Sequence, residues 1–252
     1  MSRTAPARHA ALVTALLCCL STAPALWPVV AHAQSTQGSG TSASETRSVA
    51  EFQAIAAGGN MDLVVRQGAQ SVQVQADDNL LALLETVVET GSKGATLQVR
   101  WKNGTYNIHS RSKVLVTVVV PRLSSLAAAG SGDVRVESFT TPGLQLTLAG
   151  SGDARLDGLN TDDLGVRISG SGSVGGKGTA GKLKLSIAGS GSVRLLDLRA
   201  DEVTVSIAGS GDAAVNAQKS LQVSIAGSGD VTYTGDAQVK SSVAGSGSVK
   251  KK

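Results

Sequence analysis

A four-residue motif that recurs seven times constrains this chain more than any other feature. Gly-Ser-Gly followed by Asp or Ser begins at Gly130, Gly150, Gly170, Gly189, Gly209, Gly227 and Gly245. The steps between these glycines are 20, 20, 19, 20, 18 and 18 residues. A nearly constant period of this length is typical of a solenoid, in which each repeat forms one coil and stacks on the next. We expect a sharp corner at each motif, because glycine adopts positive φ without a Cβ clash.

The residues on both sides of each corner alternate between apolar and polar. Before the corners the apolar positions are Leu144/Leu146/Leu148, Leu183/Leu185/Ile187, Val203/Val205/Ile207 and Leu221/Val223/Ile225. After the corners they are Val134/Val136, Ala154/Leu156, Val193/Leu195 and Val231/Tyr233, followed in some repeats by Phe139, Leu159 or Leu198. A period of two places one set inward and the other on the solvent side. The pattern predicts an all-β parallel solenoid of about seven coils with an aliphatic core, each coil having two or three short strands.

The solenoid repeats occupy residues 123–252, and a strand-rich N-terminal portion occupies residues 47–122. Alternation predicts strands over 61–67 and 71–75, separated by a turn at Gly68, and further strands over 95–101 and 114–120. Residues 77–79 begin the strongest helix candidate, one or two amphipathic turns that carry Leu80, Leu81, Leu83, Leu84 and Val87. Both portions form a single domain over 47–252.

Residues 1–33 have the pattern of a signal peptide, with Arg3 and Arg8 before an apolar stretch and Ala31-His32-Ala33 as a cleavage site before Gln34. Residues 34–46 are rich in Ser, Thr and Gly, which predicts a flexible linker. Both cysteines lie in the leader, so the mature chain has no disulfide. We expect an exported protein, in the periplasm or at the surface of a Gram-negative-type bacterium.

The charge of the chain argues against a nucleic-acid partner. The net charge is +4, and removal of a leader with two arginines leaves +2, which is too small for a nucleic-acid-binding surface. No segment after residue 33 has the length and hydropathy of a transmembrane span.

The fourth corner position is Asp133, Asp153, Asp212 or Asp230 in four repeats and serine in the other three. Stacked carboxylates are candidate calcium ligands. The simpler interpretation is that Asp or Ser caps the corner by accepting a backbone N–H.

An outward column of mostly hydroxyl side chains lies three residues before each corner glycine: Thr147, Arg167, Ser186, Ser206, Ser224 and Ser242. Stacked coils would turn this column into a flat strip. It is either an ordinary solvated sheet surface or a contact face for a glycan or another exported protein.

The sequence offers little for catalysis or for binding a cofactor. His109 is the only histidine after residue 33, and that part of the chain has no thiol. Asp157, Asp162, Asp163, Arg155 and Arg167 are the charged residues that a carbohydrate-active β-helix enzyme would use, and a solvated rim explains them more simply. We therefore expect no catalytic residues, no cofactor and no enzyme activity, with a carbohydrate-active β-helix enzyme as the alternative.

Three stretches in order resemble the putative auto-transporter adhesin, head GIN domain family: 52–68 (FQAIAAGGNMDLVVRQG), 72–86 (VQVQADDNLLALLET) and the AGSGDV/AGSGSV corners from 129 to 249. The resemblance covers about 51–252. It implies a right-handed parallel β-helix in an exported bacterial protein without established activity, and it supplies no catalytic residues. The sequence thus favours a non-catalytic binding or structural module, similar to an adhesin.

Overall fold

The computed structural model describes residues 35–91, 94–102 and 106–252, so the predicted signal peptide lies outside the described residues. The chain is almost entirely β-structure. Its elements are β1 (Ser35–Gln37), β2 (Ser42–Arg47), β3 (Ala54–Gly59), β4 (Asp62–Gln67), β5 (Ser71–Asp77), α1 (Asp78–Leu81), β6 (Leu84–Gly91), β7 (Gly94–Trp101), β8 (Tyr106–His109), β9 (Leu115–Val120), β10 (Ser125–Gly130), β11 (Val134–Glu137), β12 (Thr140–Gly150), β13 (Ala154–Gly170), β14 (Ser173–Gly189), β15 (Ser192–Gly209), β16 (Asp212–Gly227), β17 (Asp230–Thr234), β18 (Gln238–Gly245) and β19 (Ser248–Lys251).

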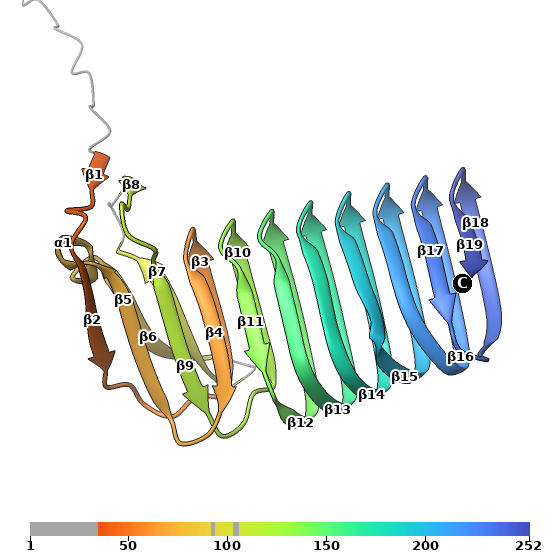
Figure 1. Ribbon diagram of the computed structural model, residues 1–252, viewed down its shortest axis with the longest axis horizontal. Helices are drawn as coiled ribbons and strands as arrows, with labels where there is room; N and C mark the ends of the chain where they lie inside the picture. The colour runs from red at the N-terminus through yellow and green to blue at the C-terminus, as the bar shows by residue number, and fades with distance from the viewer. Residues whose placement is uncertain (1–34, 92–93, 103–105) are drawn as a thin grey trace, which may run out of the picture. The chain divides into compact units, whose positions relative to one another are not determined.

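The repeats form a parallel solenoid, as the sequence predicts. From β10 to β19 the coils lie side by side in one row (Figure 1), and each pairs in parallel with the next. Equivalent residues stand opposite one another in successive coils: Leu126, Leu146, Val166, Leu185, Val205 and Val223. The ladder continues through the bends of β13, β14, β15 and β16, with register shifts only near the bends in three of the pairings between these long strands.

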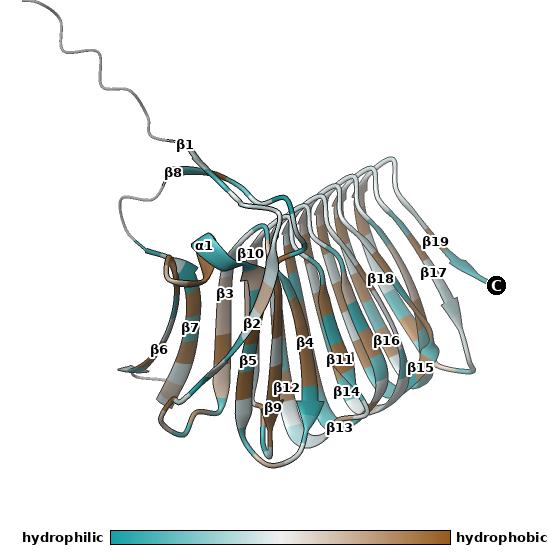
Figure 2. Cartoon of the chain, turned by 60° about the vertical axis from the view of Figure 1, so that its left-hand side comes forward, coloured by the Kyte–Doolittle hydropathy of each residue, from teal (hydrophilic) through white to brown (hydrophobic). Residues whose placement is uncertain are grey.

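The inward residues make one continuous aliphatic core. The alternating positions before and after the corners are buried, as are Phe139, Leu159 and Leu198 at the bends, and Tyr233 is partly buried against the core. In Figure 2 brown apolar and teal polar bands alternate along the coils, and the corners form a pale row along one edge. Full burial of each Leu, Val or Ile contributes about 1.5–3 kcal/mol to the stability of the fold.

The two glycines of each corner are required for different reasons. Gly189 has a φ of +120°, and a Cβ there would lie 2.6 Å from the carbonyl oxygen of Gly170. The N–H of Ser190 donates to that oxygen at 3.0 Å, so the coils cannot separate to make room. Gly191 does not have a positive φ, but a Cβ there would lie 2.7 Å from Ile168 Cγ2 and 2.8 Å from the Gly172 oxygen. The prediction of positive φ holds for the first glycine, and close approach explains the second.

The solenoid extends into the N-terminal portion. β3 and β4 pair in parallel with β10 and β11, so that Gly59 stands opposite Gly130 and forms one more corner in the row. β7 and β9 add a further parallel layer on β3 and β4. The strands that the sequence predicts here are all present, and the predicted helix begins as α1. The helix ends at Leu81, however, and Leu84 and Val87 belong to β6, which pairs with β7. The continuation of the ladder is new, because this corner reads Gly59-Asn60-Met61-Asp62 and lacks the repeated motif.

Antiparallel strands cover the N-terminal end of the stack. β6 pairs with β7, β5 pairs with β9, and β2 pairs with β5, all antiparallel. The expectation of a flexible linker over residues 34–46 is therefore wrong for residues 35–37 and 42–46, which lie in β1 and β2. β1 pairs with β8, and β2 supplies the outermost of these strands. Its Ser/Thr composition misled the prediction, because β2 is an edge strand whose side chains are mostly exposed and whose backbone supplies the stabilising hydrogen bonds.

A buried carboxylate fastens this end of the molecule. Asp77 is fully buried, and its oxygens accept hydrogen bonds from the N–H of Gly40 (3.0 Å), the N–H of Arg111 (2.8 Å), the N–H of Ser112 (3.2 Å) and the hydroxyl of Ser110 (2.8 Å). The hydrogen bonds from Ser112, Ser110 and Arg111 outweigh desolvation and hold the pKa of Asp77 far below its usual range. The carboxylate thus joins the segment before β2 to the loop before β9.

Candidate functional site

The predicted hydroxyl column forms a single row on the strands before the corners. Its members stand opposite one another in the order Thr147, Arg167, Ser186, Ser206, Ser224 and Ser242. Each of them is half-buried or exposed. The structure therefore brings these residues together, and their use as a contact face stays a prediction.

A groove of about 590 Å³ lies on a different side of the solenoid, over the strands that follow the corners. Outward residues of β4, β11, β13, β14 and β15 line it, together with Lys113 and Leu115 at the start of β9. Ten of its lining residues are charged: Lys113, Arg135, Arg155, Lys177, Arg194, Asp62, Asp133, Asp153, Asp157 and Asp197. The groove was not predicted from the sequence, although charged residues at alternate positions after the corners indicate it.

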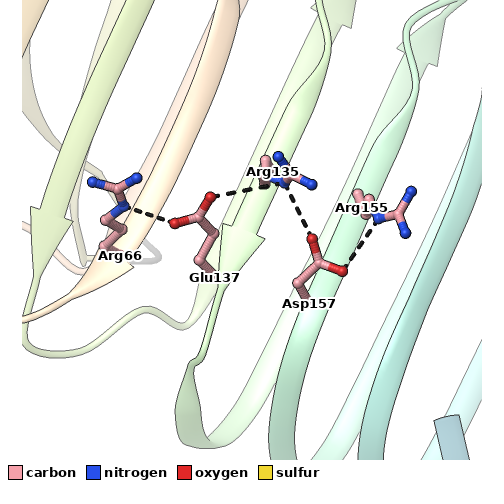
Figure 3. Close-up of polar contacts among 5 residues, drawn as sticks. All are labelled: Arg66, Arg135, Glu137, Arg155 and Asp157. Atoms are coloured by element: carbon pink, nitrogen blue, oxygen red, sulfur yellow. Dashed lines mark hydrogen bonds and ion pairs between the residues drawn. The ribbon is translucent and has the colours of Figure 1, made fainter. Parts of the chain in front are cut away.

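Ion pairs between coils order one part of the groove. Asp157 accepts from Nε of Arg155 at 3.2 Å and from Nε of Arg135 at 3.1 Å. Arg135 Nε also lies 3.8 Å from Glu137, and Glu137 accepts a hydrogen bond from Nε of Arg66 at 2.8 Å (Figure 3). Desolvation raises the pKa of Asp157, but the hydrogen bonds and charges of Arg155 and Arg135 outweigh it, so the pKa lies below its ordinary value. Both arginines contact Asp157 through Nε, and their terminal nitrogens project away from it (Figure 3).

Glycine interrupts the row of arginines in this groove. Arg135, Arg155, Gly175 and Arg194 are opposite one another in successive coils. A Cβ at Gly175 would have its nearest heavy atom, the Arg194 oxygen, at 3.8 Å, which is ordinary contact. Its φ does not lie in the left-handed region either. The fold therefore does not require glycine here, in contrast to the corner glycines. Gly175 leaves space between the side chains of Arg155 and Arg194.

Each corner aspartate accepts a hydrogen bond from a backbone N–H of the next coil. The N–H of Asp133 donates to Asp62 Oδ1 at 2.9 Å, and the N–H of Asp153 donates to Asp133 Oδ1 at 3.1 Å. Asp153, Asp212 and Asp230 likewise accept the N–H of the following coil, from Ser173, Asp230 and Ser248 respectively. The predicted cap is thus confirmed for aspartate, and the N–H belongs to the next coil.

Serine at the fourth corner position acts differently. After Ser173 and Ser192 the corresponding N–H of the next coil donates to a glycine carbonyl, that of Gly172 (3.2 Å) or Gly191 (3.1 Å). The prediction that serine accepts this N–H is therefore wrong, because the shorter side chain leaves the bond to the backbone. Ser173 instead donates its hydroxyl to Asp153 Oδ1 at 2.6 Å.

The calcium hypothesis gains no ligand cluster from this geometry. Within residues 35–91, 94–102 and 106–252, no group of three or more His, Cys, Asp or Glu side chains is placed to hold a metal ion. Asp133, Asp153, Asp212 and Asp230 each direct an oxygen to a backbone N–H. Calcium binding stays an untested prediction.

The charged residues considered for catalysis do not converge. Asp157 and Arg155 line the groove, whereas Arg167 lies in the hydroxyl row and Asp163 stands opposite Gly143, beyond the bend. A general acid needs a raised pKa, and Asp157 has a lowered one. Of the other four groove carboxylates, Asp62, Asp133 and Asp153 accept hydrogen bonds from backbone N–H groups. The described part of the chain also contains no helix long and apolar enough to span a bilayer.

Comparison with known proteins gives the same architecture. A putative adhesin from Bacteroides fragilis NCTC 9343 is 27% identical, with 86% of this chain and 100% of that chain covered and a TM-score of 0.78. A putative lipid binding protein from Parabacteroides distasonis ATCC 8503 is 26% identical, with 87% and 100% covered and a TM-score of 0.72. A putative adhesin from Parabacteroides merdae ATCC 43184, at 23% identity, covers 86% and 98% with a TM-score of 0.67 and shows the fold alone.

No curated protein matches the chain. The family described as putative auto-transporter adhesin, head GIN domain, matches residues 51–237, which is most of the chain. The chain therefore belongs to the putative auto-transporter adhesin, head GIN domain family.

Proposed function

We propose that this protein is an exported, non-catalytic binding module that holds an extended glycan in the groove over the strands after the corners. The observation that carries the proposal is the groove itself, a hollow of about 590 Å³ lined by charged side chains of both signs. Glycan hydroxyls both donate and accept hydrogen bonds, so paired Arg and Asp side chains suit them. Relatives named as adhesins support a binding role. The signal-peptide pattern over residues 1–33 supports the periplasm or the cell surface as the location.

Rigid, regularly spaced coils support an extended ligand over a compact one. The groove crosses strands of several successive coils, which are about 4.8 Å apart. A ligand chain lying along the solenoid axis would meet equivalent positions at each step. The hydroxyl row on the other side is a second candidate contact face, and it does not line this groove.

A glycan array probed with residues 34–252 tests the proposal. The variant Gly175→Arg fills the groove at a position where a side chain has room, so we expect it to fold normally and lose binding. Ser206→Arg adds the same side chain to the hydroxyl row and should leave binding intact. Loss of binding only with Ser206→Arg would assign the contact to the row instead. Absence of binding to every glycan would overturn the proposal.

Two alternatives have their own readouts. The carboxylates in the groove keep a carbohydrate-active enzyme as the second candidate, and release of reducing ends from any bound glycan would establish it in place of a non-catalytic module. The name of the Parabacteroides distasonis relative raises a lipid ligand. Cosedimentation with phospholipid vesicles tests that ligand, and binding to vesicles but to no glycan would contradict the glycan proposal.

A further inference from the structure

We infer that the groove selects an acidic glycan, whose carboxylate or sulfate lies over Gly175 between Arg155 and Arg194. This inference rests on the proposed function and adds the chemical class of the ligand. It depends on three features of the groove: a gap in a row of arginines, cationic side chains that can contact a ligand, and carboxylates that already accept hydrogen bonds from other residues.

The gap has the size of one missing side chain. Arg155 and Arg194 belong to the coils on either side of Gly175 and are opposite it in the ladder. Two coil spacings separate their backbones by about 9.6 Å. An oxyanion between two guanidinium groups makes hydrogen bonds of about 2.8 Å to each, and these long side chains can close the remaining distance. Because a Cβ would fit at Gly175, packing does not explain the glycine, and the space that it leaves can hold the anion.

The cationic groups around the gap are available to a ligand. The bond from Arg155 Nε to Asp157 orients the guanidinium and leaves its terminal nitrogens free of that carboxylate (Figure 3). Arg155 is 68% exposed. Among the described residues, Arg194 and Lys177 have no ion-pair partner, and both line the groove. Guanidinium pairs bind carboxylate and sulfate oxygens with matched geometry.

Most of the carboxylates near the gap are occupied by other partners. Asp157 is shared by two arginines, and Asp153 accepts both the N–H and the hydroxyl of Ser173. At the far end of the groove Asp62 pairs with Lys113 at 2.6 Å. Asp197 is opposite Lys177 in the ladder, and Lys177 lies two residues after Gly175. The groove has five acidic and five basic side chains, and three of the basic ones, Arg155, Lys177 and Arg194, lie on the coil of Gly175 and on its two neighbouring coils.

The experiment measures the affinity of residues 34–252 for ligands that differ only in charge. Polygalacturonate is compared with its methyl ester, and dextran sulfate with dextran, by isothermal titration calorimetry in low salt. We expect the methyl ester or the uncharged dextran to bind at least about tenfold more weakly than its acidic counterpart. The two pairs distinguish a carboxylate ligand from a sulfate ligand.

Two variants place the anion at the proposed position. Arg194→Gln should weaken binding of the acidic ligand about tenfold and leave its uncharged counterpart unchanged. Lys240→Gln makes the same change of charge on exposed β18, outside the groove, and should have no effect. Equal affinity for charged and uncharged ligands, or equal effects of the two variants, would overturn the inference while the proposed function stands. Binding to none of the four ligands would overturn the inference, whereas an empty glycan array would overturn the proposed function.

Discussion

The repeated coils and the N-terminal portion build one parallel ladder in two ways. In the repeats, each corner has two glycines, and every coil is a close copy of its neighbour. In the N-terminal portion, β3 and β4 enter the same ladder with Gly59 as the only glycine of their corner, and antiparallel strands then close the stack. Near-identical coils keep their register in the repeats. At the N-terminal end, the antiparallel strands β5 and β6 pair with the last parallel strands, β9 and β7.

The two ends of the stack differ in the same way. Within the described residues, β2 and β6 cover the N-terminal end with antiparallel pairs, and Asp77 fastens the loops around them. At the other end all residues of β18 are exposed, including Val239 and Val243. Lys240 interrupts this exposed edge, and lysine at such an edge discourages pairing with other chains. Repeated coils extend the stack, whereas antiparallel pairs and the hydrogen bonds of Asp77 terminate it at the N-terminal end.

Substitution of a corner glycine within the repeats should have the largest effect. Gly209→Val places a Cβ against the preceding coil at a φ of +128°, so we expect a loss of about 3 kcal/mol or more in the free energy of unfolding. Urea denaturation measures it. Gly58→Ala is the control in the N-terminal portion, because Gly58 has no left-handed φ, a Cβ there meets nothing within 4 Å, and the opposite residue in the next coil is Ala129. Equal losses would contradict the corner assignment.

The N-terminal portion should be most sensitive at its buried carboxylate. Asp77→Asn removes the charge and directs an amide group toward backbone N–H donors, so we expect a clear fall in melting temperature, second to that of the corner variant. Asp78→Asn is the matched control, because Asp78 is exposed. A melting temperature equal to that of the control would show that the fastening has no energetic role.

Acid should weaken the N-terminal end more than the repeated coils. The pKa of Asp77 is lower in the folded state than in the unfolded state, so its contribution is complete above the unfolded value of about 3.9. The contribution is lost as the pH falls below that value toward the folded pKa. Hydrogen exchange of the Gly40 and Arg111 amides should therefore accelerate between pH 4 and 2, relative to amides in the repeated coils. Uniform protection across the molecule at low pH would argue against this assignment.

The corner aspartates should contribute little each. Asp212→Ala removes the acceptor of the Asp230 N–H, but the bond is exposed and a glycine carbonyl serves instead after Ser173 and Ser192. We expect a loss of about 0.5–1 kcal/mol, and a smaller loss for Asp212→Ser, measured by thermal unfolding. A loss as large as that of Gly209→Val would mean that the side-chain ladder, and not the glycine backbone, holds the corner.

Removal of divalent cations should have the smallest effect. Because the corner carboxylates accept backbone N–H groups, we expect no change in melting temperature between 1 mM calcium and a chelator. A stabilisation by calcium that Asp133→Asn abolishes would establish the metal hypothesis. Calcium binding would also explain why the fourth corner position is aspartate in four repeats and serine in three.

The sequence by itself determined the solenoid, its corners, the inward residues and the row from Thr147 to Ser242. These features repeat at a fixed interval, so local patterning is enough to align them. It did not reveal that β3 and β4 continue the ladder, because their corner shares only Gly59 and an aspartate with the motif. The strand β2 was missed because its stability comes from pairing with β5, more than 20 residues away.

Only the tertiary structure decided the candidate site. The fixed interval aligns Gly175 with Arg155 and Arg194, but it does not show the groove over them or the ion pairs of Asp157 with arginines from two coils. These features depend on how the outward side chains of neighbouring coils lie in space. Periodicity reports what successive coils have in common. A binding site on a solenoid depends on the position where one coil differs from its neighbours, and stacking alone shows what surrounds that position.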